Sequence, residues 1–133
     1  MTVIMQKTIL LIDDDEEEFY IFKLALDLAA INYHCVWASG LEQATQMVKT
    51  LRPDFIFIDI NMPRYDGINC LKKLKEMEQI RQSTFVMYST YISDDDHEKA
   101  MQLGADQCIH KPENIRILLK QLVRLFNDKT HSA

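Results

Sequence analysis

Carboxylates, a hydroxyl and an ammonium follow four of the short apolar segments in this sequence. They are Asp13 and Asp14 after the first segment, Asp59 after the third, Ser89 after the fourth and Lys111 after the fifth. Three carboxylates in one cleft repel each other, so a cation is expected to join them. Oxygen ligands without nearby His or Cys favour a hard cation, and Mg²⁺ is the natural choice because it accepts one or two carboxylates and keeps several waters.

Asp59 differs from the first two acids because it ends an apolar segment that indicates a central, buried strand. An aspartate is ionised at neutral pH, with an ordinary pKa near ~3.9, so it needs no general base to act as a nucleophile. Attack on phosphorus would produce an aspartyl phosphate. Such a transfer requires mainly positioning and neutralisation of charge, which the metal, the Lys111 ammonium and the Ser89 hydroxyl could provide.

These residues must be positioned by secondary structure, and the sequence alternates between two periods. Apolar or strand-favouring segments predict strands at residues 8–12, 33–38, 55–58, 85–88 and 107–109. Apolar residues at helical spacing predict helices within residues 19–29, 41–51, 68–74 and 115–126, with a less amphipathic one at 97–103. Capping signals agree: Ser39 with Glu42, Ser93 with Asp96, and Asp66 before the third helix.

Strict alternation of five strands and five helices predicts a doubly wound α/β fold with a parallel sheet and helices on both faces. In such folds ligands bind at the carboxyl ends of the strands. The candidate residues all follow strands, so we expect them to meet at that edge.

Length and composition limit the class of protein. A chain of 133 residues predicts one domain, and its 47% hydrophobic content is ordinary for a soluble globular protein. No apolar stretch approaches the roughly 20 residues of a membrane helix, and we see no signal peptide. The net charge of −5 comes from six consecutive acids at residues 13–18, and no basic face supports direct nucleic-acid binding. Of these acids, Glu16, Glu17 and Glu18 are expected only to favour the first turn of the following helix, where negative charge meets the helix dipole. Three scattered cysteines match neither a disulfide framework nor a metal site, which indicates a cytoplasmic location.

Five motifs in order resemble the response-regulator receiver domain of bacterial two-component signalling. The first is the acidic sequence LLIDDD at residues 10–15, and DINMP at 59–63 with Asp66-Gly67 resembles the phosphorylation-site motif. Ser89, Gly104-Ala105-Asp106 and Lys111-Pro112 complete the pattern. The resemblance covers residues 7–126, so we expect a single receiver domain over residues 1–133 with short tails.

The resemblance implies a role for each matching residue. Asp59 would be the phosphoacceptor, and Ser89 and Lys111 would contact the phosphoryl group. Asp13, Asp14, Asp59 and the backbone carbonyl of Asn61 would hold Mg²⁺. The resemblance also implies a flavodoxin-like sheet in the order 2-1-3-4-5 and a cis bond between Lys111 and Pro112.

Cys108 and Trp37 stand outside this set of roles. Cys108 occupies the position, three before Lys111, that usually carries an aromatic residue which swings inward on activation. A thiol cannot make that movement, so the sequence does not show how a signal would pass from the site to the distal face. Trp37, the only tryptophan, is expected to serve in packing, too far from the site to report on metal binding.

The leading hypothesis is a stand-alone phosphorylation switch in the cytoplasm, not an enzyme beyond its own phosphorylation and dephosphorylation. A histidine kinase or phosphotransfer protein would donate the phosphoryl group. The output would be a protein target, or a dimer formed through the last two helices and fifth strand, without nucleic acid or membrane. The chain stops just after the last predicted helix, so no output domain is expected.

Three alternatives remain. A phosphorylation-independent adaptor with the same fold is favoured only by Cys108. A small-molecule phosphatase using an aspartyl phosphate would want a second Asp where Asn61 stands. A flavin-binding relative of the fold would need a hydroxyl-rich phosphate loop after the first strand, but residues 13–15 at that place are acids.

Overall fold

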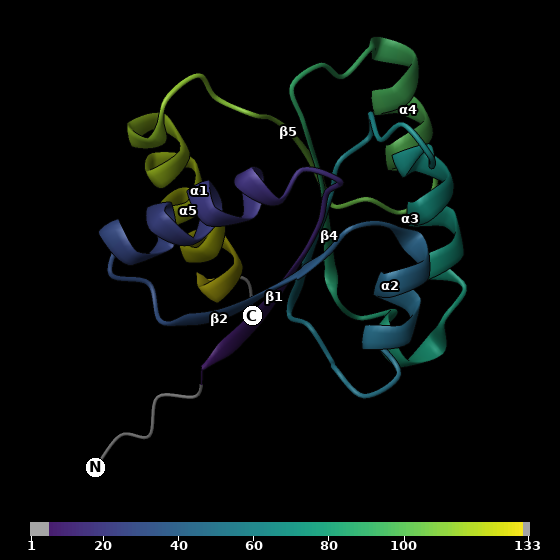
Figure 1. Ribbon diagram of the computed structural model, residues 1–133, viewed down its shortest axis with the longest axis horizontal. Helices are drawn as coiled ribbons and strands as arrows, with labels where there is room; N and C mark the ends of the chain where they lie inside the picture. The colour runs from purple at the N-terminus through teal and green to yellow at the C-terminus, as the bar shows by residue number, and fades with distance from the viewer. Residues whose placement is uncertain (1–5, 132–133) are drawn as a thin grey trace.

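The computed structural model describes residues 6–131, with side chains described to residue 127, and shows a five-stranded parallel sheet between two layers of helices (Figure 1). In chain order the elements are β1 (Lys7–Ile12), α1 (Glu16–Leu28), β2 (Tyr33–Ala38), α2 (Leu41–Met47), β3 (Phe55–Ile58), α3 (Gly67–Lys75), the 3₁₀ helix η1 (Glu78–Ile80), β4 (Thr84–Ser89), α4 (Asp94–Gln102), β5 (Gln107–His110) and α5 (Ile115–His131). The predicted strands and helices are confirmed to within a few residues, and η1 was not predicted.

The strand order is β2-β1-β3-β4-β5, as the resemblance implied. All four pairings are parallel. Ile12 at the end of β1 pairs with Ala38 of β2 on one side and with Ile58 of β3 on the other, so these three strands end at the same level. That shared level brings the residues after β1 and β3 together.

Two hydrophobic cores lie on opposite faces of the sheet because successive side chains in a strand point to opposite faces. Leu10 and Ile12 of β1 face one core, and Ile9 and Leu11 face the other. The first core is covered by α2, α3 and α4, and the second by α1 and α5, as Figure 1 shows. Strands buried on both faces explain why the sequence has continuous apolar segments rather than alternating ones.

Most predicted helix starts are found. The Asp66 carboxylate accepts a hydrogen bond from the Ile68 backbone N–H, and Ser93 Oγ accepts one from the Asp96 N–H. The predicted capping box of Ser39 and Glu42 is wrong. The N-cap of α2 is Gly40, so the third helical position is Gln43, whose side-chain oxygen accepts a hydrogen bond from the Ser39 backbone N–H.

Within the described residues, no helix has the length and apolar character that a membrane crossing requires.

Candidate functional site

The polar residues that the sequence places after the strands are held by continuations of the sheet. The Asp13 N–H donates to Ala38 O (3.1 Å), and the Asp59 N–H donates to Ile12 O (3.0 Å). The Lys111 N–H donates to Ser89 O (2.8 Å) in the same way. The hydrogen-bond ladder therefore extends one residue past β1, β3 and β5, and it fixes the backbone of the candidate residues.

The predicted acids form a cluster. One carboxylate oxygen each from Asp13, Asp14 and Asp59 lies within 4.8 Å of the others. Asp13 is 1% exposed and Asp59 is 6% exposed, whereas Asp14 faces solvent. Two buried carboxylates beside a third, exposed one form an oxygen-lined site that is reached from the Asp14 side.

Lys111 lies among these acids, and its ammonium contacts Asp13 more closely than Asp59. The distances from Nζ are 2.7 Å to Asp13 Oδ2, 3.5 Å to Asp59 Oδ2 and 3.8 Å to Glu18 Oε1. Nζ also lies 5.7 Å from the centre of the Tyr88 ring, close enough for a cation–π contact. One ammonium thus lies within 3.8 Å of three carboxylates.

Burial and ion pairing shift the pKa values of Asp13 and Lys111 in opposite directions. Burial raises the pKa of Asp13 to about 6, although the Lys111 ammonium and the Asp15 N–H both favour its ionised form. Burial would lower the pKa of Lys111, but its hydrogen bond with Asp13 and the charges of Asp13, Asp59 and Glu18 together raise it. Lys111 is therefore a cation at neutral pH.

Ser89 and Asn61 form a hydrogen-bonded chain that ends on Asp59. The buried Ser89 hydroxyl donates to Asp59 Oδ1 at 2.7 Å. Asn61 Nδ2 donates to Ser89 Oγ at 2.9 Å and to Tyr91 O at 2.8 Å. The Asn61 backbone N–H also donates to Asp59 Oδ1, at 3.1 Å. Asp59 is consequently oriented by two donors on one oxygen, which leaves Oδ2 toward Lys111.

The segment after Asp59 needs a glycine. The Gly67 N–H donates to Ile60 O at 2.9 Å, and Asn61 and Asp66 form an isolated antiparallel bridge. A Cβ at position 67 would collide with the Asp59 carbonyl oxygen and with the backbone of Ile60. The close approach of α3 to the backbone of Asp59 thus explains the glycine of the Asp66-Gly67 pair in the sequence motif.

Three expectations about the site need correction. The peptide bonds that the structure describes are all trans, including the one between Lys111 and Pro112. The trans form is the one that X–Pro bonds ordinarily favour. In this backbone conformation the Lys111 N–H donates to Ser89 O of β4, and Lys111 Nζ contacts Asp13. Glu18, which we assigned only to the helix dipole, faces Lys111. Its position in the first turn of α1, directly after the acidic loop, is the signal that could have revealed it.

Trp37 is the third correction. We expected this residue to lie far from the site, but its indole Nε1 donates to the backbone carbonyl of Asp13 at 2.7 Å. The register that pairs Trp37 with Leu11 brings its side chain beside the end of β1. A tryptophan on the edge strand next to the acidic loop was the available signal.

Cys108 lies on β5 opposite Met87 and is half-buried against the core that α2, α3 and α4 cover. Burial raises the pKa of its thiol. Its half-buried position on the last strand is in keeping with a packing role.

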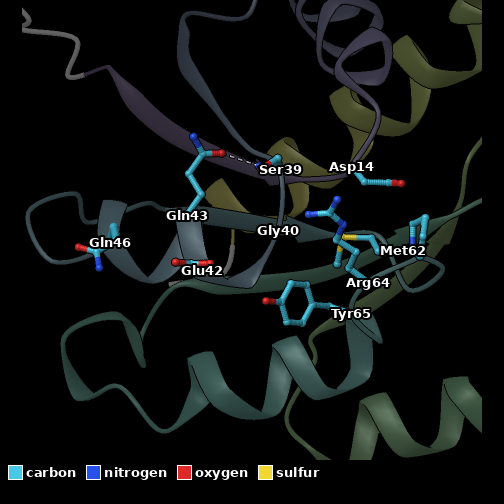
Figure 2. A pocket seen from close by; sticks show the side chains of 10 residues that line it. Asp14, Ser39, Gly40, Glu42, Gln43, Gln46, Met62, Arg64 and Tyr65 are labelled. Atoms are coloured by element: carbon cyan, nitrogen blue, oxygen red, sulfur yellow. Dashed lines mark hydrogen bonds between the residues drawn. The ribbon is translucent and has the colours of Figure 1, made fainter.

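A pocket of about 670 Å³ borders the acidic cluster between α2 and the β3–α3 segment. Figure 2 shows Asp14 at one side of this pocket, with Met62 and Arg64 beside it and the Tyr65 ring near Gly40. Asp14 is thus the member of the cluster that is open to solvent from the side of α2.

Comparison with known proteins shows the family. The chain belongs to the response regulator receiver domain family of two-component systems, whose sequence pattern matches residues 9–123. The phosphate regulon transcriptional regulatory protein PhoB of Pseudomonas aeruginosa is 30% identical over 87% of this chain and 50% of its own length. The alkaline phosphatase synthesis regulatory protein PhoP of Bacillus subtilis is 32% identical over 81% of this chain and 43% of its own. The chain therefore spans about half the length of these two relatives.

Other matches cover nearly the whole length of both proteins. The polar-differentiation response regulator DivK of Brucella anthropi is 23% identical, covering 93% of this chain and 99% of DivK. The structure of the phosphorylated cyanobacterial phytochrome response regulator RcpA has a TM-score of 0.84 at 23% identity and covers 97% of each chain. The Mn²⁺-bound form of response regulator Rcp1 has a TM-score of 0.80 at 20% identity and covers 96% of each. These structures show the same fold.

Proposed function

We propose that this receiver domain is a phosphorylation switch whose phosphoacceptor is Asp59. The observation that carries the proposal is the environment of that carboxylate: Oδ1 accepts the Ser89 hydroxyl at 2.7 Å, and Oδ2 lies 3.5 Å from the Lys111 ammonium. A hydroxyl and an ammonium on either side of one carboxylate are suited to binding the oxygens of a phosphoryl group placed there. Membership of the receiver family supports the same role.

The donor set fits Mg²⁺. Asp13, Asp14 and Asp59 offer oxygens within 4.8 Å of one another, and a single ammonium does not balance their charge. Hard divalent cations prefer such oxygen ligands. We assign Asp13, Asp14, Asp59 and the backbone carbonyl of Asn61 to the cation. The Mn²⁺-bound form of Rcp1, which has the same fold, supports a divalent cation. When bound, the cation would neutralise charge on the transferred phosphoryl group.

The transfer needs no proton abstraction from the nucleophile. A carboxylate oxygen of Asp59 forms a bond to phosphorus while the phosphorus–nitrogen bond of a phosphohistidine breaks, and the electron pair leaves with the imidazole nitrogen. Lys111 remains a cation throughout, since its acidic neighbours raise its pKa. Ser89 and Lys111 then contact the new phosphoryl oxygens. The protein contributes positioning and charge, which is what phosphoryl transfer chiefly requires.

The donor is expected to be a histidine kinase or a histidine phosphotransfer protein. The exposed side of α1, which begins directly after the acidic loop, offers apolar contact area for such a partner; its exposed residues are Tyr20, Ile21, Leu24 and Leu28. Large apolar side chains grouped on a solvent-facing helix are typical of a protein-binding surface. We place this encounter in the cytoplasm.

The output is expected at the surface of α4, β5 and α5. A phosphoryl group adds about −1.5 to −2 charge, which would draw Ser89 and Lys111 toward it. Because Ser89 ends β4 and Lys111 follows β5, their movement would shift the loops that lead into α4 and α5. That shift would bias a surface that binds a downstream protein or a second copy of the chain.

Mass spectrometry after incubation with Mg²⁺ and a small acyl phosphate tests the proposal. The wild-type protein should gain one phosphoryl group, and Asp59→Asn should gain none. Asp95→Asn, which changes an exposed aspartate in α4, is the matched control and should be modified like the wild type. An unmodified wild type would contradict the proposal in favour of an adaptor, and release of phosphate from many esters with multiple turnovers would favour a phosphatase.

A further inference from the structure

Trp37 is a half-buried residue on the edge strand β2, and its side chain is hydrogen-bonded to the loop that carries the acids. Its indole N–H donates to the Asp13 backbone carbonyl at 2.7 Å. This is a short, direct contact between an edge-strand side chain and a residue of the acidic cluster.

The indole supplies a donor at the point where the sheet stops supplying one. The Asp13 N–H still pairs with Ala38 O, but β2 ends at Ala38. If the parallel ladder continued, the Asp13 carbonyl would accept a hydrogen bond from the backbone N–H of Gly40, two residues after Ala38. The chain turns into α2 there, and the Trp37 indole takes that place.

The same ring also contacts the first turn of the following helix. Phe19 of α1 stacks on Trp37 with ring centres 6.4 Å apart and an interplanar angle of 23°. Trp37 thus contacts both ends of residues 13–19, the segment that contains Asp13, Asp14 and Glu18. Of these two contacts, the hydrogen bond acts on Asp13 of the acidic cluster, whereas the stacked ring packs the first turn of α1 against β2.

Such a support matters because the segment is under electrostatic stress. Asp13, Asp14 and Asp59 lie within 4.8 Å of one another, and like charges at this separation push the acidic loop away from β3. The Asp13 carboxylate is held by the Asp15 N–H at 2.9 Å and by Lys111 at 2.7 Å. The carbonyl, on the other side of the same residue, is held by Trp37.

We infer that Trp37 is a positioning residue for the divalent-cation site. It holds the Asp13 carbonyl and thereby keeps the carboxylates of the acidic loop in place. This inference rests on the proposed function, because it takes the acidic cluster as the cation site. Trp37 does not touch the cation or the phosphoryl group. Its effect is on the affinity for Mg²⁺ and not on the transfer step.

Two variants separate the hydrogen bond from the packing. Trp37→Phe keeps an aromatic ring against Phe19 and removes the N–H donor. Phe19→Leu removes the stacked ring and keeps the donor. One hydrogen bond contributes about 1 kcal/mol, so Trp37→Phe should weaken Mg²⁺ binding by about fivefold in calorimetry. Phe19→Leu should bind Mg²⁺ like the wild type. With an acyl phosphate donor and saturating Mg²⁺, Trp37→Phe should recover the wild-type rate.

A second measurement uses the wild-type protein alone. Trp37 is the only tryptophan, so a ¹H–¹⁵N spectrum contains a single indole Nε1 peak. Titration with Mg²⁺ should move this peak along the same binding curve that calorimetry gives. This readout does not depend on whether Trp37→Phe folds.

The outcomes distinguish this inference from the proposed function. If the wild type takes up Mg²⁺ but Trp37→Phe binds it equally well, or if the indole peak does not move, the role of Trp37 is overturned while Asp59 remains the phosphoacceptor. If both variants weaken binding equally, Trp37 acts through packing and the inference is also overturned. If the wild type takes up no Mg²⁺, the proposed metal site itself fails.

Discussion

The hydroxyl of Ser89 donates a 2.7 Å hydrogen bond to Oδ1 of Asp59, which lies 30 residues earlier in the chain. Both residues are buried at the ends of neighbouring strands, β4 and β3. The contact joins the proposed phosphoacceptor to the loop that leads into α4. A group attached to Asp59 through Oδ1 would therefore displace the Ser89 hydroxyl from that oxygen.

Replacing Ser89 with alanine removes one donor to the transferred phosphoryl group. A hydrogen bond to a charged group contributes roughly 1.5–3 kcal/mol, so phosphorylation by an acyl phosphate should slow roughly tenfold to hundredfold. The rate is measured by mass spectrometry over time at saturating Mg²⁺. Ser89→Thr, which keeps the hydroxyl, is the control and should retain most of the rate. An unchanged rate in Ser89→Ala would exclude the hydroxyl from the reaction.

Replacing Asn61 with alanine should loosen the β4–α4 loop without phosphorylation. The Asn61 amide donates to both Ser89 Oγ and Tyr91 O, so it ties the loop after β4 to the end of β3. Loss of a bond worth about 1 kcal/mol should speed amide exchange around Tyr91 by about fivefold. Hydrogen exchange with mass spectrometry measures this. Asn69→Ala, on the exposed side of α3, is the control, and equal exchange in both variants would contradict the proposed link.

Replacing Lys111 with methionine should tighten Mg²⁺ binding while it slows phosphorylation. The ammonium lies 2.7 Å from Asp13 and 3.5 Å from Asp59, where its charge opposes a second cation. Removing one unit charge this close should lower the calorimetric dissociation constant for Mg²⁺ by at least about tenfold. Phosphorylation should slow because the phosphoryl oxygens lose their ammonium partner. Lys111→Arg keeps the charge and is the control, and a weaker affinity in Lys111→Met would show that Lys111 supports the site instead.

Removing Mg²⁺ should lower the thermal stability of the protein. A ligand at about ten times its dissociation constant stabilises the folded state by about 1.4 kcal/mol, because it binds the folded form alone. Thermal unfolding followed by circular dichroism should therefore show a higher midpoint in Mg²⁺ than in a chelator at matched ionic strength. Asp13→Asn should lose most of this difference. A full difference in that variant would place the bound cation away from the acidic cluster.

The sequence by itself determined the alternation of elements and the residues that end the strands. The apolar segment at residues 55–58 predicts a strand because a strand buried on both faces must be apolar at every position. Once the strands are parallel, their carboxyl ends share one edge, so Asp13, Asp59 and Ser89 had to come together. The predicted order of the strands came from the resemblance, and the structure has that order.

Only the tertiary structure decided which of these groups contact each other. Lys111 and Asp13 are 98 residues apart, and the 2.7 Å between their charged atoms depends on the side-chain conformations of both and on the loops beneath them. The hydrogen bond from the Trp37 indole to the Asp13 carbonyl depends on the residue at which β2 stops pairing with β1, and a shift of one residue would change it. The same precision decided the cap of α2 at Gly40 and the trans bond before Pro112. Hydrophobic periodicity is local and repeated, so a sequence reveals it, whereas such contacts arise from single distances between distant segments.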